Sequence, residues 1–152
     1  MSNYHVTVAD YPSKQLVGMK VRTSMKNSHQ DCPALWQHFG PRIGELLGNR
    51  ESYGVSVMIN EEEFYYWAVV EWEPLSPLPE GMERIDIPAG KYAKCTAPSL
   101  NELADVYMYI YGGWPESQDE YTFDEKKACI ELYRTGWQPE DALDVYMPLK
   151  AK

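Results

Sequence analysis

The sequence lacks the long apolar runs and the cysteine pairs that mark several classes of protein. No stretch of about 18 apolar residues occurs in the 152-residue chain, so no membrane-spanning helix and no membrane partner are expected. Residues 1–5 are polar and give no secretory signal, which makes the cytoplasm the expected compartment. Cys32, Cys95 and Cys129 form no C-x-x-C pair, which argues against a disulfide framework and a zinc site.

Basic residues are also scarce. The chain has 14 Lys and Arg against 23 Asp and Glu, which gives a formal net charge of −9. Such a surface repels phosphate backbones, so direct nucleic-acid binding is not expected. An acidic surface raises the local concentration of cations or serves solubility alone, and composition leaves both open. The three histidines are scattered and no phosphate-binding or serine-hydrolase motif occurs, so the sequence predicts neither a metal nor a cofactor.

Aromatic residues with polar atoms are abundant. Twelve Tyr and five Trp stand against three Phe. Phe and Leu fill a core equally well, whereas Tyr and Trp also carry hydrogen-bonding groups that suit a surface facing a ligand or a partner. Composition alone leaves two interpretations open: a ligand-binding surface, or a core that uses tyrosine.

The first half of the chain predicts a strand, a helix and two strands. Residues 15–25 are rich in β-branched side chains and predict a strand. Asp31 is a suitable N-cap for a helix that Pro41 should kink or split, and Gly48–Asn49 should end it. Residues 53–59 and 64–72 alternate or are aromatic, which predicts two strands joined by a turn.

The second half repeats this order. Residues 83–96 predict a strand interrupted at Pro88, and Ser99 with Glu102 forms a capping box that opens a helix ending at Gly112–Gly113. An acidic loop over residues 114–127 and strands at 128–134 and 143–149 follow. The prediction is therefore one α+β domain over residues 1–152, built from tandem pseudo-twofold strand–helix–strand–strand repeats at about residues 1–75 and 80–152. Two main helices should cover one side of the antiparallel sheets, and the other side should hold a concave ligand pocket.

One carboxylate falls among aromatic residues. Side chains alternate along a strand, so Cys129, Glu131 and Tyr133 should share one face, and Ile130 should pack beneath the helices. The predicted pocket face also carries Tyr146. A carboxylate among rings is costly unless it is paired, and an incoming cation would compensate it with help from cation–π contacts. Glu131 could instead act as a general acid or base, or lie at a sheet edge in water.

At these residues the sequence resembles the GyrI-like small-molecule-binding family. This is the effector-binding domain of some bacterial multidrug-responsive transcription activators, and it also occurs as standalone proteins. The matching segments cover nearly the whole chain: YYWAVVEWEP at 65–74, IPAGKYA at 87–93, YIYGGWPES at 109–117, CIELY at 129–133 and DVYMPL at 144–149. No helix-turn-helix segment precedes Tyr4, so a direct transcription-factor role is not expected.

The resemblance implies a pseudo-twofold α+β domain with a ligand pocket between its halves. The acidic residue of that pocket falls on Glu131. The aromatic lining implied by the family comprises Tyr133, Tyr146, Tyr65, Trp67, Trp36, Tyr107 and Trp114.

Three functions remain open from the sequence. The first is capture of lipophilic, aromatic or cationic small molecules for sensing or sequestration. The second is hydrolysis of reactive xenobiotics such as cyclopropane-containing toxins, in which Glu131 and Tyr133 would be the catalytic residues. The third is a protein-interaction role, with a transcription regulator or DNA gyrase as the partner.

Overall fold

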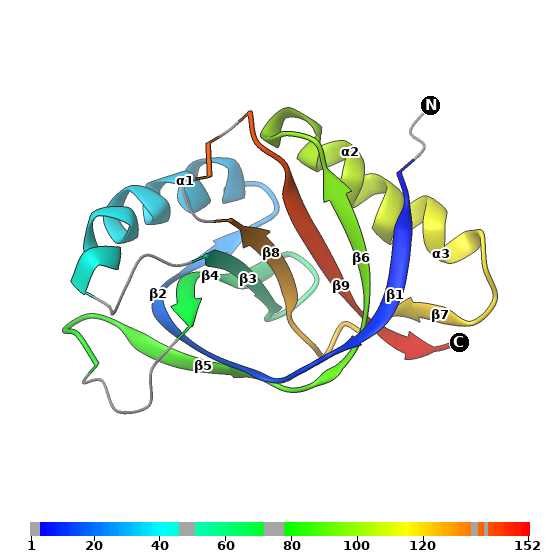
Figure 1. Ribbon diagram of the computed structural model, residues 1–152, viewed down its shortest axis with the longest axis horizontal. Coiled ribbons are helices and arrows are strands. Elements are labelled where there is room, and N and C mark those ends of the chain that lie inside the picture. The colour runs from blue at the N-terminus through cyan, green and yellow to red at the C-terminus, as the bar shows by residue number, and fades with distance from the viewer. Residues whose placement is uncertain (1–3, 46–50, 72–77, 135–136, 139) are drawn as a thin grey trace.

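The computed structural model describes residues 4–45, 51–71, 78–134, 137–138 and 140–152. Within these ranges the chain forms an α+β fold, a nine-stranded antiparallel sheet with helices packed on it (Figure 1). The strands are β1 (Val6–Tyr11), β2 (Lys14–Ser24), β3 (Ser52–Met58), β4 (Glu63–Glu71), β5 (Glu83–Ile87), β6 (Gly90–Ala97), β7 (Tyr121–Phe123), β8 (Cys129–Tyr133) and β9 (Leu143–Ala151). The helices are α1 (Ser28–Phe39), α2 (Leu103–Met108) and α3 (Trp114–Glu116). None of these helices has the length and apolar character needed to cross a bilayer.

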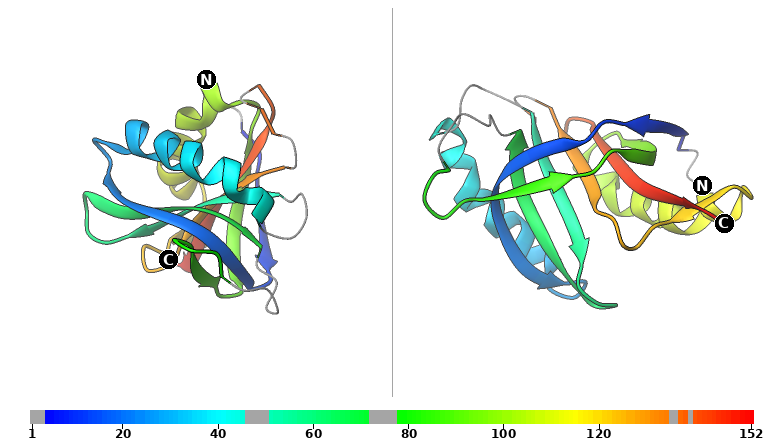
Figure 2. Two further views of the ribbon diagram at one scale, coloured as in Figure 1. Left: turned by 90° about the vertical axis from the view of Figure 1, so that its left-hand side faces the viewer. Right: turned by 90° about the horizontal axis from the view of Figure 1, so that it is seen from below.

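The sheet is built from two groups of four strands that meet at β3 and β8. Its order is β1-β6-β9-β8-β3-β4-β2-β5, and β7 pairs with β9. Val6 lies opposite Cys95 in the β1–β6 pair, and Lys14 lies opposite Ile87 in the β2–β5 pair. Because β1 leads directly into β2 and β5 into β6, the two strand pairs form one long antiparallel ribbon that spans both groups (Figures 1 and 2).

The predicted order β2-α1-β3-β4 is present in the first half, and the second half has β6-α2-β8-β9. Three further strands, β1, β5 and β7, complete the sheet. Residues 83–96 were predicted as one interrupted strand, and the interruption separates β5 from β6, which pair with different neighbours. The prediction of an uninterrupted acidic loop over residues 114–127 is wrong, because this segment contains α3 and β7.

Both main helices cover the same face of the sheet, which we call the helix face. Leu35 and Phe39 of α1 pack with Tyr66 and Ala68 of β4, and Val106 of α2 packs in the cluster of the second half. The opposite face, which we call the far face, carries a third cluster of strand residues that includes Leu16, Val55, Val69 and Ile130. The core is therefore divided between the two faces of the sheet.

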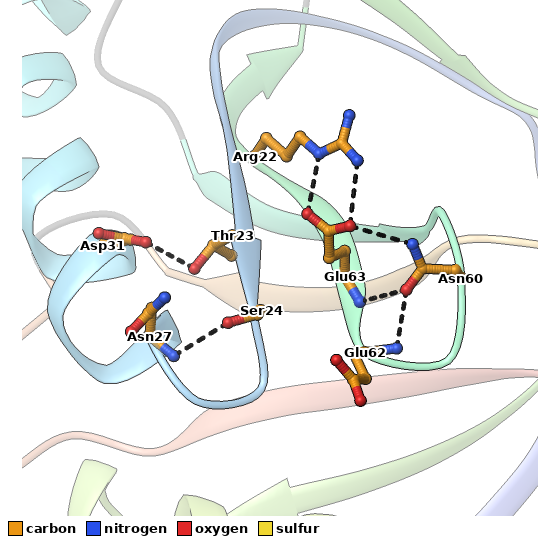
Figure 3. A network of polar contacts seen from close by, with 8 residues as sticks. All are labelled: Arg22, Thr23, Ser24, Asn27, Asp31, Asn60, Glu62 and Glu63. Atoms are coloured by element: carbon orange, nitrogen blue, oxygen red, sulfur yellow. Dashed lines mark hydrogen bonds and ion pairs between the residues drawn. The ribbon is translucent and has the colours of Figure 1, made fainter.

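Local hydrogen bonds explain why α1 begins earlier than predicted. The helix starts at Ser28 with Asn27 as its N-cap, not at Asp31. Thr23 Oγ1 donates to the Asp31 carboxylate at 2.7 Å, so Asp31 ties the first turn of α1 to β2 (Figure 3). At the other end, a 3₁₀ turn over Gly40–Glu45 follows α1, in agreement with a split near Pro41. The predicted helix end at Gly48–Asn49 and the final strand residue Trp72 lie outside the described residues.

The β3–β4 turn follows the sequence prediction closely. Asn60 Oδ1 accepts hydrogen bonds from the backbone N–H groups of Glu62 and Glu63, at 2.9 and 2.8 Å. The Arg22 guanidinium donates to the Glu63 carboxylate across the β2–β4 pair (Figure 3). An asparagine that caps two backbone donors is a common way to close a hairpin.

The second helical segment does not end at its glycines. A 3₁₀ turn (Leu100–Glu102) leads into α2, a π-helical turn (Tyr109–Gly113) follows, and α3 continues to Glu116. Ser99 makes no side-chain capping bond, and the Glu102 carboxylate accepts from the Tyr4 hydroxyl at 3.0 Å instead. Tyr4 from outside the helix thus binds the carboxylate that the predicted capping box would have used.

Candidate functional site

Glu131 lies in the middle of the sheet, where the two groups of strands meet. It is on β8, opposite Gly54 of β3 and opposite Val145 of β9. Its side chain is 8% exposed. Side chains directly opposite each other in paired strands share a face, and Val145 packs with Val106 of α2. Glu131 therefore lies on the helix face.

The Glu131 carboxylate accepts hydrogen bonds from three tyrosines. Tyr66 of β4 and Tyr133 of β8 donate to Oε1 at 3.0 and 2.7 Å. Tyr107 of α2 donates to Oε2. Trp36 of α1 donates its indole N–H to the Tyr66 hydroxyl at 3.0 Å. We call Glu131, Tyr66, Tyr107, Tyr133 and Trp36 the carboxylate cluster.

The ring packing around the carboxylate joins both helices to the sheet. Trp36 meets Tyr133 edge to face with ring centroids 5.5 Å apart, and Tyr133 meets Trp137 in the same way at 4.8 Å. Tyr107 stacks with Tyr111 at 5.9 Å. Rings in these orientations contribute beyond the area they bury, so the cluster is held by packing as well as by hydrogen bonds.

The three tyrosines remain protonated at neutral pH. Burial raises the pKa of Tyr66, Tyr107 and Tyr133 well above the usual value of 10.0, and the nearby Glu131 charge raises each pKa further. A protonated phenol donates to a carboxylate, so the three hydroxyls serve as neutral donors to Glu131.

No positive side chain compensates Glu131 in the part of the chain that the structure describes. The ion pairs found there involve other carboxylates, such as Asp144 and Glu63. The donors to this carboxylate are neutral, so no opposite charge among the described residues balances it. The cluster can therefore attract a cation that brings little water with it.

Gly54 makes room for the carboxylate. A Cβ atom at this position would lie 2.3 Å from the Tyr66 hydroxyl oxygen and 2.6 Å from Glu131 Oε1. A glycine inside a strand often marks such a close approach. Gly54 and Tyr66 are the members of the site that the sequence did not single out, and a glycine within an otherwise alternating strand was the available signal.

The structure separates the residues that the sequence grouped in one pocket. Trp36, Tyr107 and Tyr133 surround Glu131, and Trp114 packs in the neighbouring cluster on the same face. The remaining aromatic residues, Tyr65, Trp67 and Tyr146, pack in the far-face cluster. The prediction that Glu131 faces away from the helices is wrong, since Tyr107 of α2 contacts its carboxylate directly.

Two thiols lie close to the carboxylate cluster. Burial raises the pKa of Cys32 on α1 to about 12, with the Glu131 charge as the next cause. Burial also raises the pKa of Cys129 on β8 to about 12, against an opposing hydrogen bond with Tyr111, and the Glu131 charge adds to the rise. Both thiols are therefore protonated at neutral pH and are poor nucleophiles.

Comparison with known proteins supports the fold expected from the GyrI-like resemblance. The family described as integron-associated effector binding protein matches residues 7–149. The transcriptional regulator BrlR of Pseudomonas aeruginosa is 29% identical over 158 residues, which cover 97% of this chain and 56% of the regulator. The chain thus spans little more than half the length of that relative.

Two solved structures share the fold at low sequence identity. The integron cassette protein VCH_CASS2 of Vibrio cholerae has a TM-score of 0.69 at 15% identity. The alignment covers 98% of this chain and 100% of that chain. SAV2435, in a structure bound to tetraphenylphosphonium, has a TM-score of 0.75 at 18% identity, covering 96% of this chain and 94% of that one.

Proposed function

The chain belongs to the integron-associated effector binding proteins, and from this premise we propose that it captures lipophilic aromatic cations at Glu131. The single observation that carries the proposal is a carboxylate 8% exposed that accepts three tyrosyl hydrogen bonds and has no ion-pair partner among the described residues. A cation that carries aromatic groups would neutralise Glu131 and stack against the surrounding rings.

The position of the site between the two halves supports the same proposal. The strand order is mirrored about the β3–β8 pair, and Glu131 comes from β8 beside Gly54 of β3. We take the halves as related by an approximate twofold axis, with the ligand at their junction. The binding of tetraphenylphosphonium by SAV2435, which shares this fold, suggests the chemical class of the ligand.

Ligand entry requires a tyrosine to move, because three hydroxyls already occupy the carboxylate oxygens. Tyr107 is the member of the cluster placed to do so. It lies on the six-residue helix α2, which a π-helical turn with two glycines follows. Short helices interrupted in this way are held mainly by their tertiary contacts. We propose that the cation displaces the Tyr107 hydroxyl from Oε2.

Calorimetric titration with tetraphenylphosphonium tests the proposal. The wild-type chain should bind the cation, and Glu131→Gln should weaken binding about 10- to 100-fold, since a lost contact to a charge is worth about 1.5–3 kcal/mol. Glu63→Gln is the matched control, because Glu63 is an exposed carboxylate on the β3–β4 turn. Triphenylphosphine oxide, which has similar rings and no net charge, should not distinguish Glu131→Gln from the wild type. Equal cation affinity for a folded Glu131→Gln variant would overturn the proposal.

Displacement of Tyr107 has its own test. Tyr107→Phe removes the hydrogen bond that the ligand has to break, so cation affinity should rise about fivefold, or about 1 kcal/mol. Tyr109→Phe serves as the control on the same helical segment. A loss of affinity in Tyr107→Phe would mean that the hydroxyl contacts the ligand instead of yielding to it.

Hydrolysis of a reactive xenobiotic is the second candidate function. The Tyr133 hydroxyl lies 2.7 Å from Glu131 Oε1, a distance suited to proton transfer between a tyrosine and a carboxylate. In this case Glu131 would activate water and Tyr133 would donate a hydrogen bond to the substrate. Turnover of a strained cyclopropane substrate that disappears in both Glu131→Gln and Tyr133→Phe would favour the enzyme over the binding protein.

A further inference from the structure

A second group of tyrosines lines a pocket on the far face of the sheet, away from Glu131. Its volume is about 140 Å³, and Tyr11, Tyr53, Tyr92 and Tyr146 supply its rings. The aliphatic side chains of Ile87, Ile130 and Leu132 form the rest of its apolar wall. Because Ile130 and Leu132 flank Glu131 along β8, the pocket and the carboxylate cluster lie on opposite sides of the same strand.

Two of these tyrosines are buried without a hydrogen-bond partner for their hydroxyl groups. Tyr53 is 4% exposed and Tyr92 is 3% exposed. In the described ranges neither hydroxyl makes a hydrogen bond, whereas all three tyrosines around Glu131 do. Leaving a buried polar group unpaired is unfavourable, so such groups are rare unless water or a ligand completes them.

The pocket offers hydrogen-bond donors. Burial raises the pKa of Tyr53, and burial with the charge of Asp144 raises the pKa of Tyr146 to about 12, so both hydroxyls keep their protons at neutral pH. The Lys14 ammonium lies 5.3 Å from the centre of the Tyr53 ring. It also lies 3.8 Å from the Glu71 carboxylate, which already balances its charge.

The charge around the pocket disfavours an anion. Glu51 lines it and is exposed, and the charges of Glu51 and Glu71 both act on Tyr53. Unlike Glu131, Glu51 is open to water, which screens any attraction for a cation. A neutral molecule that accepts hydrogen bonds could pair with the Tyr53 and Tyr92 hydroxyls, and the carboxylates of Glu51 and Glu71 would not repel it.

We infer that the far-face pocket is a second ligand site, which takes a neutral molecule of one aromatic ring bearing an oxygen acceptor. The oxygen would accept from the hydroxyl of Tyr53 or of Tyr92, and the ring would lie against Ile87 and Ile130. The pocket volume of about 140 Å³ suits a single aromatic ring, since an apolar cavity of about 150 Å³ is known to hold benzene. Tyr11 frames the space, with its ring edge to face against Tyr146 at 5.0 Å and against Tyr92 at 6.0 Å. The inference is independent of the function proposed for Glu131.

The test uses acetophenone as the probe, with ethylbenzene as its partner of similar shape that lacks the oxygen. In methyl-labelled protein, acetophenone should shift the NMR signals of Ile87, Ile130 and Leu132. Ethylbenzene should bind at least fivefold more weakly, and benzoate more weakly still. The comparison of these three probes needs no variant, so it stands even where a substitution disturbs folding.

Two variants sharpen the test. Tyr53→Phe combined with Tyr92→Phe should lower acetophenone affinity about tenfold and leave ethylbenzene affinity unchanged, with Tyr109→Phe as the control. Glu131→Gln should leave acetophenone affinity unchanged, which separates this site from the carboxylate cluster. Equal affinities for acetophenone and ethylbenzene, or shifts confined to residues of the carboxylate cluster, would overturn the inference, as would the absence of any shift.

Discussion

Two buried carboxylates lie on neighbouring strands of this sheet and meet opposite surroundings. Glu131 of β8 is 8% exposed and Asp144 of β9 is 2% exposed. Glu131 lies opposite Val145, and Asp144 lies opposite Leu132. They therefore point to different faces, Glu131 toward the helices and Asp144 toward the far face.

The partners of the two carboxylates differ in charge. Asp144 accepts from Arg134 at 2.8 Å and from Thr96 at 2.7 Å, and the Lys94 ammonium lies 3.8 Å away. Glu131 accepts from tyrosyl hydroxyls alone among the described residues. The chain itself neutralises Asp144, which is typical of a structural ion pair. Glu131 has no cationic partner among the described residues, and a ligand could supply one. This difference carries the functional proposal.

The largest expected effect comes from filling the space that Gly54 leaves beside Glu131. Gly54→Ala would place a Cβ atom against the Tyr66 hydroxyl and the carboxylate, and overpacking of this kind typically costs about 1–3 kcal/mol. We expect a loss near 3 kcal/mol in urea unfolding, together with loss of cation binding. Gly40→Ala is the control, because a Cβ atom there would meet nothing within 4 Å apart from its chain neighbours and the adjoining helix backbone. Similar unfolding midpoints for the two variants would contradict the tight packing seen at Gly54.

Removing one hydroxyl donor from each carboxylate tests whether the partners that remain stabilise the two carboxylates to different extents. Tyr133→Phe takes a donor from Glu131, which has no cation to rely on, so we expect a loss of about 2 kcal/mol. Thr96→Val takes a donor from Asp144, which keeps Arg134, so we expect about 1 kcal/mol. Chemical denaturation measures both. A larger loss for Thr96→Val would reverse the comparison.

Alkaline pH should weaken the carboxylate cluster over a wider range than it weakens the contribution of Tyr146 on the far face. The pKa values of Tyr66, Tyr107 and Tyr133 are raised in the folded chain, so folded protein keeps protons that unfolded tyrosines release above 10.0. Stability is then fully present below pH 10 and falls as pH rises beyond it, by about 1.4 kcal/mol per pH unit for each such tyrosine.

Stability measured against pH in Tyr133→Phe and Tyr146→Phe separates the contributions of these two tyrosines. Tyr133→Phe should reduce the slope throughout the alkaline range. Tyr146→Phe should reduce it only up to the pKa of Tyr146, at about 12. If Tyr133→Phe left the slope unchanged, the hydroxyl of Tyr133 would not be held protonated by its surroundings.

The smallest expected effect concerns salt. The Arg134 side chain is 60% exposed, so water and ions screen its pair with Asp144. Arg134→Gln should cost less than about 1 kcal/mol at low ionic strength and less again at high ionic strength. The cost of Tyr133→Phe should not change with salt, because its hydroxyl is neutral and buried. If the stability cost of Arg134→Gln and that of Tyr133→Phe changed equally with salt, the Asp144 ion pair and the Glu131 carboxylate would be equally open to ions in solution, and the comparison would fail.

Much of the fold could be predicted from local pattern. The strands now seen at β2, β3, β4, β8 and β9 were expected within about two residues, because alternation and β-branched residues are local signals. The short strand β1 was missed, since six residues beside Pro12 offer little pattern. Gly112 and Gly113 were expected to end a helix, and tertiary packing carries the helix through them as a π-helical turn instead.

The candidate site could be predicted only in part, because alternation within a strand is a local signal and the matching of one strand to the next is not. Alternation along β8 correctly placed Glu131 and Tyr133 on one side of the strand, where the Tyr133 hydroxyl donates to the Glu131 carboxylate. That Glu131 is the acid of the ligand pocket stays a prediction. Alternation also holds on β9, where Asp144 lies opposite Leu132 and Tyr146 lies opposite Ile130, so both are on the far face. Joining the two pairs into one pocket failed, because alternation along one strand does not say which face of the next strand it matches.

The sequence alone determined most of the strand and helix types and the acidic and aromatic character, because these depend on residue type and short-range periodicity. Tertiary structure decided that Glu131 pairs with Val145 rather than with a neighbour one position away, and so decided which tyrosines meet the carboxylate. A shift of one residue in register turns every side chain of a strand to the other face. That register joins residues that are 12 to 16 positions apart in the sequence.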